Sequence, residues 1–508
     1  MRNEDAAKLL SNLDLGSVVA ETDNLLESAR VETSVFDDLL ADRVDLILGT
    51  KGSGKTALYR IFVDFLPDLL LKSHRVVIAH GVRQRQDSVF LAYKKQFDRL
   101  SEDDFTDFWC VYLISLAYEQ FVRSKDYKDL LLDCSSEIAA FRRQYREASI
   151  PEFERKKSLK EIIGWTLEAV KRLKPSVTWT PQGDVGQFEF SLGDGSPQQE
   201  GKIKTVSAVL PPKITELSTS LEDILVKAGL SLWLMVDQLD ELFERRSKTE
   251  QKALRGLLKA VRLFKSENIR VKIFLRDDIL EQIVAGRGFT ALSHITARSS
   301  DTLRWSEEQI LTLVVRRIFS NEPLSTWVQV DERLYNTSIE YQKQLFYNIF
   351  TKTVYRPPNQ STTLRWIYNH TKDGRGVVTP RDVIHLLDRA RQKQIDIYRR
   401  DLQGETDRLI HGVAVNYGLE ELSQQKRSTY LEAEFPDKWK EIRKLIGGGT
   451  EYSEKALIRL FGKKHEQTIE DLISLGIIER ATKKSKRSYK IPFLYRRGLE
   501  CTQKFVSA

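Results

Sequence analysis

The residues Gly49-Thr50-Lys51-Gly52-Ser53-Gly54-Lys55-Thr56 form a phosphate-binding pattern directly after the apolar stretch 44–48. Glycines let the backbone wrap closely around phosphate oxygens, and the positive end of the following helix favours the same anion. In this pattern the Lys55 amine reaches the β- and γ-phosphates, and the Thr56 hydroxyl binds Mg²⁺. A glycine-rich loop without function is disfavoured, because the strand, the spacing and a predicted helix Thr56–Leu66 all agree. The sequence therefore predicts a nucleoside triphosphate site.

A second motif places carboxylates directly after a short apolar strand. The run Leu232–Val236 is bounded by polar residues, as expected of a buried strand in a parallel sheet, and Asp237 follows it. A carboxylate at the carboxyl end of such a strand holds Mg²⁺ directly or through water. We therefore expect Asp237 to share a magnesium ion with Thr56. Asp240 and Glu241 follow three and four residues later.

Several arginines are candidates for contacts with bound phosphates. Arg276 ends a predicted strand, Val271–Leu275, and lies between the two motifs if this strand neighbours the one before the glycine-rich loop. The alternative for Arg276 is an ordinary ion pair. Arg316 and Arg317 could supply an arginine finger to a neighbouring subunit, although we favour a solvated helix face. The run Thr379-Pro380-Arg381-Asp382 opens a helix with Pro in its first turn.

The composition is that of a globular protein with few special features. A length of 508 residues suggests about three domains, and the net charge of +8 is only a mild hint of an acidic partner. Three widely spaced cysteines and seven scattered histidines argue against a cysteine-rich or zinc-finger metal site and indicate a reducing compartment. We recognise no signal peptide and no apolar run near the ~20 residues that span a bilayer. We therefore expect a cytoplasmic protein without membrane attachment.

Strands alternating with helices predict a doubly wound α/β domain with a parallel sheet. The expected strands are Val44–Leu48, Arg75–Val82, Leu232–Val236 and Val271–Leu275. We divide the chain into a helical preamble (1–40), a P-loop core (41–305), an all-helical lid (306–420) and a C-terminal domain (421–508). Within the core, 174–201 is rich in Gly, Pro, Ser and Gln, and predicts an inserted hairpin or a disordered linker.

The C-terminal residues predict a winged helix. Two helices, Glu454–Phe461 and His465–Leu475, precede a Gly476 C-cap and a hairpin around the basic turn Lys483-Lys484-Ser485-Lys486-Arg487. Helix, turn, helix and a basic hairpin is a common nucleic-acid-binding geometry, and such a wing can neutralise backbone phosphates without reading bases. The alternative is a module that contacts a protein or locks the lid.

The motifs resemble those of known ATPases. The run Gly49 to Ala57, Asp-Gln-Leu-Asp-Glu at 237–241 and Phe-Leu-Arg-Asp-Asp at 274–278 are similar to a family of bacterial P-loop ATPases often found in anti-phage defence operons. Their order, from about residue 44 to 499, resembles the origin-recognition and STAND side of the AAA+ group. The resemblance implies an ATP-driven switch or assembly that works with a separate effector protein, and a nucleotide contact that extends to Ala57.

The resemblance also implies roles for single residues. In the NACHT branch of the STAND ATPases a displaced acidic pair is catalytic, so Asp240 or Glu241 would orient the attacking water, and we favour Asp240 slightly. The alternative is that the pair caps the next helix. Gln238 cannot serve as the base that ordinary AAA+ proteins carry after the magnesium ligand, which puts their mechanism in doubt. Arg276 would be the sensor-1 contact to the γ-phosphate, and Arg381 the sensor-2 contact of the lid.

Two functions follow from these features. The first is an Mg²⁺-dependent ATPase switch whose nucleotide state governs homo-oligomer assembly and a partner effector, DNA or RNA. The second is a DNA-binding, origin-recognition-like scaffold in which ATP is structural and turnover is slight. The chain has no guanine-specific Asn-Lys-x-Asp motif, which favours ATP over GTP. We recognise no acceptor-binding motif of a P-loop kinase and no effector activity in the chain.

Overall fold

The computed structural model describes two compact units. The described residues are 1–81, 93–148, 150, 164, 166–168, 170, 212–239, 247–262, 264, 266–284, 297–355, 361–483 and 486–507. The first unit, called the P-loop unit below, consists of residues 1–66, 274–281 and 298–508. The second unit consists of 67–273 and 282–297. The P-loop unit therefore combines segments from both ends of the chain. The division into four domains that we expect from the sequence stays a prediction.

A four-stranded sheet with the strand order β1-β4-β3-β2 forms the α/β part of the fold. Its strands are β1 (Leu46–Gly49), β2 (Val76–His80), β3 (Ser231–Val236) and β4 (Ile269–Arg276). β2 pairs with β3 and β3 with β4, both in parallel, with Val77 opposite Leu232 and Leu234 opposite Val271. All four predicted strands are present within a few residues of their expected ends. The order also places the strand that ends at Arg276 beside β1, which is the condition for Arg276 to lie between the two motifs.

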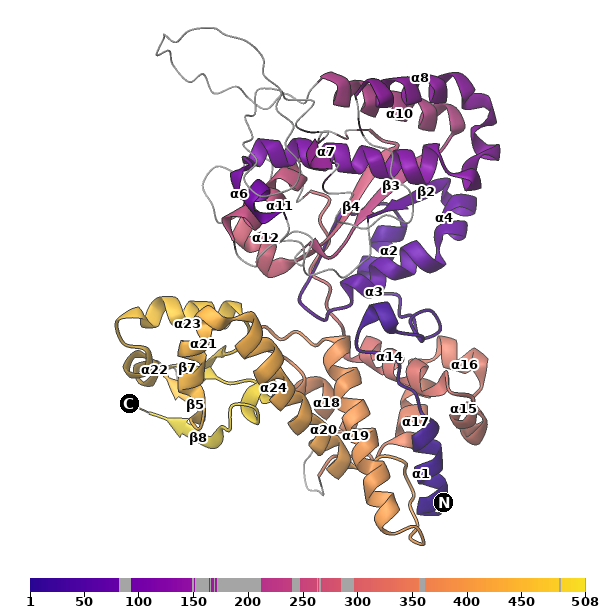
Figure 1. Cartoon of the computed structure of the whole chain (residues 1–508). Coiled ribbons are helices and arrows are strands. Elements are labelled where there is room, and N and C mark those ends of the chain that lie inside the picture. Colours follow the sequence, from indigo (N-terminus) through magenta and orange to yellow (C-terminus); the bar gives the residue numbers. More distant parts are fainter. Residues whose placement is uncertain are drawn as a thin grey trace, which may run out of the picture. The chain divides into compact units, whose positions relative to one another are not determined.

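The described helices of the second unit are α4 (Pro67–His74), α6 (Lys94–Arg99), α7 (Glu102–Ala117), η3 (Tyr118–Val122), η4 (Lys125–Tyr127), η5 (Asp129–Cys134), α8 (Ser135–Glu147), α10 (Pro212–Ala228), α11 (Lys248–Val261) and α12 (Asp277–Val284), which crosses into the P-loop unit. α7 lies over β2 and β3 and packs against α11, and α8 pairs with α10 (Figure 1). A capping box of Ser101 and Asp104 begins α7, and Trp109 donates to the carbonyl of Ala253 at 2.8 Å. α7 is buried on nearly all sides because it lies between the sheet and other helices.

The P-loop unit is mostly helical. Its elements before the C-terminal domain are α1 (Asn3–Asn12), η1 (Ala20–Thr22), α2 (Ser34–Leu40), β1, α3 (Lys55–Arg60), η2 (Ile61–Phe65), α14 (Glu307–Phe319), α15 (Glu322–Val328), α16 (Glu332–Thr337), α17 (Ile339–Ile349), α18 (Thr363–His370), α19 (Pro380–Arg400) and α20 (Gly412–Gln425). The predicted helix Thr56–Leu66 is therefore an α-helix that continues as the π-helix η2. Thr379 caps α19 by accepting from the N–H of Asp382 at 3.2 Å.

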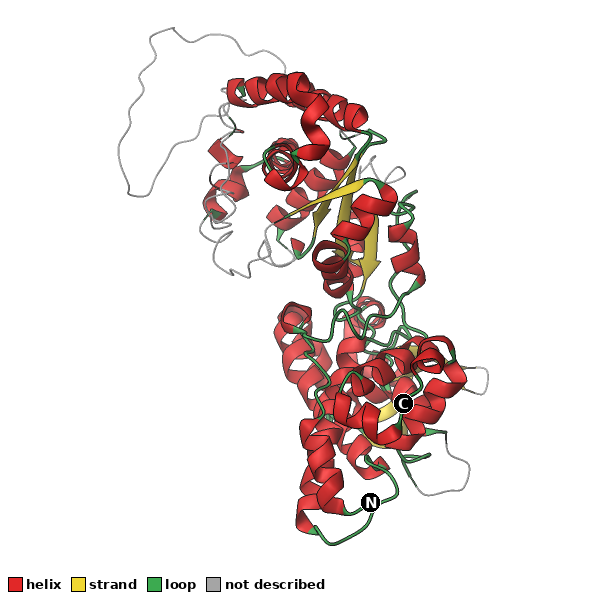
Figure 2. Ribbon diagram, turned by 90° about the vertical axis from the view of Figure 1, so that its right-hand side faces the viewer, coloured by secondary structure: helices red, strands yellow, loops and turns green. Residues whose placement is uncertain are grey.

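The C-terminal domain contains the two helices and the hairpin expected of it. Its elements are η7 (Lys426–Glu432), α21 (Pro436–Ile442), η8 (Arg443–Leu445), β5 (Gly449–Ser453), α22 (Glu454–Phe461), η9 (Gly462–Lys464), α23 (His465–Ser474), β6 (Glu479–Lys483), β7 (Lys486–Lys490), α24 (Phe493–Arg496) and β8 (Thr502–Val506). Gly476 has the left-handed φ of +71° expected of a C-cap. β5 and β8 extend the hairpin into a sheet with the order β6-β7-β5-β8. The described strands therefore form two four-stranded sheets; Figure 2 draws the strands in yellow.

One hydrophobic core joins α1, the lid helices and the C-terminal domain. Leu10 of α1, Phe346 of α17, Leu387 of α19, Leu422 of α20 and Leu472 of α23 all belong to it. α1 packs against α19, and α19 packs along α20 (Figure 1). The N-terminal helix α1 and the C-terminal domain therefore share one hydrophobic core with the helices of 306–420.

The cysteines Cys110, Cys134 and Cys501 are free thiols. Among the described residues, no helix is long and apolar enough to cross a membrane. The predicted insertion at 174–201 lies outside the described residues.

Acid should destabilise the fold through His370. Its ring lies between Trp366 and Phe493, with ring centroids 3.9 and 4.1 Å away, and burial lowers the pKa of His370 to about 4. Because the unfolded chain takes up this proton first, stability should fall as the pH falls from about 6.5 towards 4. We expect His370→Phe to flatten the pH dependence of the urea midpoint between pH 7 and pH 4.5. The exposed His74→Gln variant should keep the wild-type slope, and an unchanged slope in His370→Phe would contradict this assignment.

Candidate nucleotide-binding site

The loop between β1 and α3 folds around its own lysine. Gly52 and Gly54 have φ angles of +82° and +101°, values that side chains other than glycine rarely adopt. Lys55 is 9% exposed, and its Nζ donates to the carbonyls of Gly49 (2.8 Å) and Thr50 (2.9 Å). These bonds hold a positive charge inside the loop that the sequence predicts to bind phosphate.

Two hydroxyl groups of this loop indicate that it fits a polar ligand. Thr50 Oγ1 and Ser53 Oγ are buried and have no hydrogen-bond partner among the residues that the structure describes. Buried polar groups are normally hydrogen-bonded, so these hydroxyls and the enclosed ammonium of Lys55 suit an anion such as a nucleotide phosphate. Thr56, the predicted magnesium ligand, and Ala57 are half-buried in the first turn of α3.

An unpredicted residue, Trp305, braces the loop from outside. Its Nε1 donates to the carbonyl of Ser53 at 2.7 Å, and its ring lies next to Gly54. The hydroxyl of Tyr368 in turn donates to the carbonyl of Trp305 at 3.0 Å. The backbone N–H of Leu303 donates to Leu48 in β1 at 2.8 Å, so the segment before α14 runs beside β1 and its loop.

Arg276 lies in a buried network of ion pairs. Its side chain is 9% exposed and makes two hydrogen bonds of 2.9 Å to the carboxylate of Asp278. Its Nη1 also lies 3.5 Å from Oε2 of Glu434, and the other oxygen of Glu434 pairs with Lys51 of the loop. The ion pair that the sequence offered as the alternative for Arg276 is therefore present. The sensor-1 role stays a prediction.

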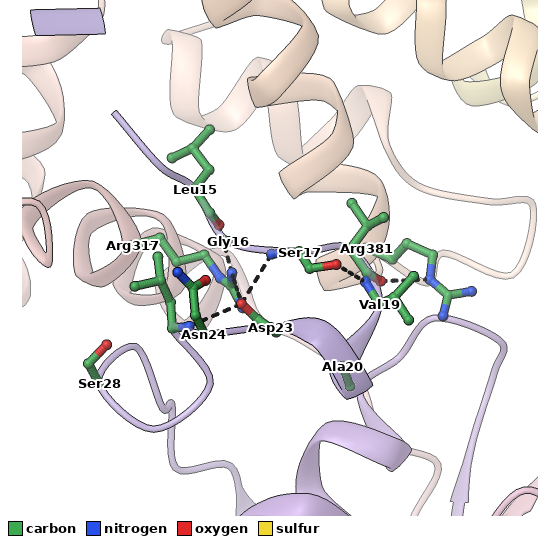
Figure 3. Close-up of polar contacts among 12 residues, drawn as sticks. Leu15, Gly16, Ser17, Val19, Ala20, Asp23, Asn24, Ser28, Arg317 and Arg381 are labelled. Carbon is green, nitrogen blue, oxygen red and sulfur yellow. Dashed lines mark hydrogen bonds and ion pairs between the residues drawn. The ribbon is translucent and has the colours of Figure 1, made fainter. Parts of the chain in front are cut away.

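Arg381 meets both the loop and the N-terminal segment. A Cβ atom at Gly52 would lie 3.2 Å from Cβ of Arg381, so the two residues are neighbours. Nε of Arg381 donates to the carbonyl of Val18 at 3.2 Å (Figure 3). The structure therefore brings Arg381, Arg276 and the loop together within the P-loop unit. The sensor-2 role of Arg381 stays a prediction.

The structure corrects the interpretation of Arg316 and Arg317. Arg317 is buried and forms a two-bond ion pair with Asp23, with distances of 2.5 and 3.2 Å, and it also donates to the carbonyl of Leu15 (Figure 3). Arg316 donates to the carbonyl of Arg30. Both side chains tie α14 to the N-terminal segment, so they do not form a solvated face. A role towards a neighbouring subunit stays a prediction. No local pattern indicates this, because Asp23 and Arg317 are far apart in the chain.

The acidic motif belongs to the second unit. Asp237 follows the last residue of β3 and is half-buried, which agrees with its predicted place at the strand end. Gln238 has a left-handed φ of +59°, which costs energy in a residue other than glycine. Asp240 and Glu241 lie outside the described residues. Nowhere in the described part do three or more His, Cys, Asp or Glu residues gather into a metal site.

Comparisons with known proteins give distant structural likenesses. No protein-family model matches the chain, and no curated protein matches it significantly. The solved ORC2 protein of Aeropyrum pernix, in ADPNP-ADP complexes, aligns with a TM-score of 0.38 and 11% identity over 93% of this chain and 92% of its own. A Walker-type ATPase of Pyrococcus abyssi aligns with a TM-score of 0.36 and 12% identity over 94% and 95%. Likenesses at this level assign no residue and no activity. The α/β fold with a parallel sheet rests on the strands described above.

The Asp23–Arg317 pair should contribute strongly to stability. Removing one partner leaves the other charge buried, so we expect Asp23→Ala to lower the free energy of unfolding by about 3–5 kcal/mol in urea titrations. Arg317→Met should have a similar effect, and the double variant should lose less than the sum of the two. Glu4→Ala, which breaks the exposed pair with Lys8, is the control and should change little. Additive losses in the double variant would contradict the coupling.

Proposed function

We propose that the protein binds ATP with Mg²⁺, hydrolyses it, and uses the nucleotide state as a switch. The observation that carries the proposal is the loop 49–56, with its left-handed glycines Gly52 and Gly54 and the ammonium of Lys55 enclosed by loop carbonyls. Loops of this sequence cradle phosphates with backbone N–H groups, and their lysine pairs with the β- and γ-phosphates.

The chain's own residues supply the electrostatics of hydrolysis. Lys55 and Arg276 would stabilise the charge that develops on the transferred phosphoryl group, and Arg381 would contact the phosphates from the lid. Thr56 and Asp237 would hold the magnesium ion, which when bound neutralises phosphate charge. Water forms a bond to the γ-phosphorus while the bond to the β–γ bridging oxygen breaks, giving ADP and phosphate.

Orientation of the attacking water would fall to Asp240 or Glu241. Gln238 cannot accept the water's proton, although a glutamine can orient a water molecule by hydrogen bonding. We favour Asp240, whose carboxylate can both orient water and accept a proton. Replacement of Asp240 by Asn keeps the size of the side chain and removes its basicity, so it tests this assignment directly.

The wider role that we propose is the ATPase component of a bacterial anti-phage defence system. Its support is the similarity of the motifs at 49–57, 237–241 and 274–278 to that family of ATPases. In this role the nucleotide state would govern assembly of a homo-oligomer and contact with a protein effector or with DNA or RNA. The contact of Glu434 with both Lys51 and Arg276 links the site to the C-terminal domain, as a switch requires.

Nucleic acid binding through the C-terminal domain is the second candidate, and the charges of the domain favour one part of it. Helix α23 exposes Glu466 and Glu470, which would repel the phosphates that flank a DNA groove. The hairpin β6–β7 instead exposes Arg480 and Arg487, with side chains 62% and 80% accessible. We therefore propose that any DNA contact uses the hairpin and phosphates, without base reading by α23.

The Lys55→Ala variant tests the ATPase proposal. Since it removes the cation that pairs with the β- and γ-phosphates, we expect steady-state phosphate release to fall at least about 100-fold. Lys72→Ala, which removes an exposed lysine of α4, serves as the matched control and should keep wild-type turnover. Normal hydrolysis by the Lys55→Ala protein would refute the proposal. If the wild type binds ATP without turnover, both with and without double-stranded DNA, the result would favour the alternative function, a DNA-binding scaffold in which ATP is structural.

Salt dependence distinguishes hairpin contacts from other DNA contacts. If the hairpin neutralises phosphates, replacing Lys483, Lys484, Lys486 and Arg487 by Gln should weaken binding to duplexes of any sequence and flatten the salt dependence. Fluorescence anisotropy at several salt concentrations measures both quantities. The matched variant Glu466→Gln/Glu470→Gln should bind as well as the wild type or better. Equal binding by the hairpin variant would exclude this interface.

A further inference from the structure

Glu434 brings a carboxylate from the C-terminal domain to the phosphate-binding loop. It lies between η7 and α21, and its side chain is only 4% exposed. One carboxylate oxygen pairs with Nζ of Lys51, inside the loop sequence, and the other lies 3.5 Å from Nη1 of Arg276. No motif in the sequence singles out this residue.

The burial of this carboxylate makes its partners important. A buried carboxylate is tolerated only when cations or hydrogen-bond donors compensate for the loss of water. Among the described residues, Glu434 pairs with the cations Lys51 and Arg276, and Arg276 also donates two hydrogen bonds to the carboxylate of Asp278. Glu434 is therefore held at the loop by charge.

We propose that Glu434 is a built-in competitor of the nucleotide's terminal phosphate for Lys51 and Arg276. This inference rests on the function proposed above. Lys51 belongs to the loop, and Arg276 ends the strand beside β1, so both cations are placed for the anion that the loop binds. A phosphate and the Glu434 carboxylate carry the same sign of charge, so the two anions exclude each other from this cation pair.

Displacement of Glu434 would be transmitted along the chain on both sides. Before it, Lys426 pairs with Asp382 in the first turn of α19 at 2.8 Å. After it, α21 begins at Pro436, and Lys438 of α21 pairs with Asp471 of α23. ATP binding therefore releases the segment 426–442 from the loop and frees the C-terminal domain from this contact. ADP, which lacks the terminal phosphate, leaves the contact in place.

Nucleotide affinities of Glu434→Gln test the proposal. The amide keeps the size of the side chain and removes its charge, so it should compete less well for Lys51 and Arg276. We expect this variant to bind a non-hydrolysable ATP analogue about ten-fold more tightly than the wild type, with a much smaller change for ADP. Glu432→Gln, a nearby carboxylate that pairs with Arg427, is the matched control and should bind like the wild type. If the Gln variant does not fold, Glu434→Asp takes its place in the same affinity measurements, because it keeps the charge but carries it on a shorter side chain.

The second measurement follows the segment itself. Hydrogen exchange of residues 426–442 should increase when the ATP analogue is added to the wild-type protein and stay unchanged with ADP. When Lys51→Gln is already present, Glu434→Gln should raise the affinity for the ATP analogue by a smaller factor than it does in the wild type. The reason is that one of the two cations for which Glu434 competes is already absent.

The outcomes separate this proposal from the proposed function. If the wild type and Glu434→Gln bind the analogue with equal affinity, Glu434 is not a competitor, although the nucleotide site stands. Glu434 is likewise not a competitor if the gain in affinity of Glu434→Gln is as large for ADP as for the analogue. If neither protein binds any nucleotide, the proposed function fails and this inference fails with it.

Discussion

Ion pairs link the phosphate-binding loop to the C-terminal domain and to the end of β4, and a further pair links α14 to the N-terminal segment. Buried Arg317 holds Asp23 of the N-terminal segment, Arg276 holds Asp278, and Glu434 bridges Arg276 and Lys51. The buried charges among them are costly to bury alone and are tolerated because a partner compensates for each; they are Asp23, Arg276, Arg317 and Glu434. The consequence is that the N-terminal segment, the end of β4 and the C-terminal domain cannot shift freely at the loop.

The hydrophobic core of the P-loop unit works with these ion pairs. α1 packs on α19, and the same core continues through α20 into α22 and α23. Dense packing of this kind transmits displacement rather than absorbing it. Helices α19, α20, α22 and α23 therefore belong to one packed core, and Glu434 lies in the segment between α20 and α22.

Local patterns in the sequence were sufficient for the four strands of the parallel sheet and for the helices and hairpin at 454–490. Short, mostly apolar runs are buried on both faces in a parallel sheet, which is why β1 to β4 lie where the sequence predicts them. The helix–helix–hairpin order of residues 454–490 followed from helical periodicity and the Gly476 cap. The π-helix after α3 was missed, because periodicity does not distinguish it from the end of an α-helix. The exposed face predicted for Arg316 and Arg317 was wrong, since the N-terminal segment covers it.

The sequence by itself determined the phosphate-binding loop. It also determined the three strands at whose carboxyl ends the loop, Asp237 and Arg276 lie. These depend on neighbouring residues, whose types and spacing dictate backbone conformation and burial. Only the tertiary structure decided that Trp305 supports Ser53, that Arg381 lies against Gly52, and that Glu434 pairs with Lys51 and Arg276. Such contacts join residues that are distant in the chain. The energies of these contacts depend on distance and burial, which no local pattern encodes. Charged side chains that the sequence predicts to be solvated can therefore be buried ion-pair partners in the folded chain.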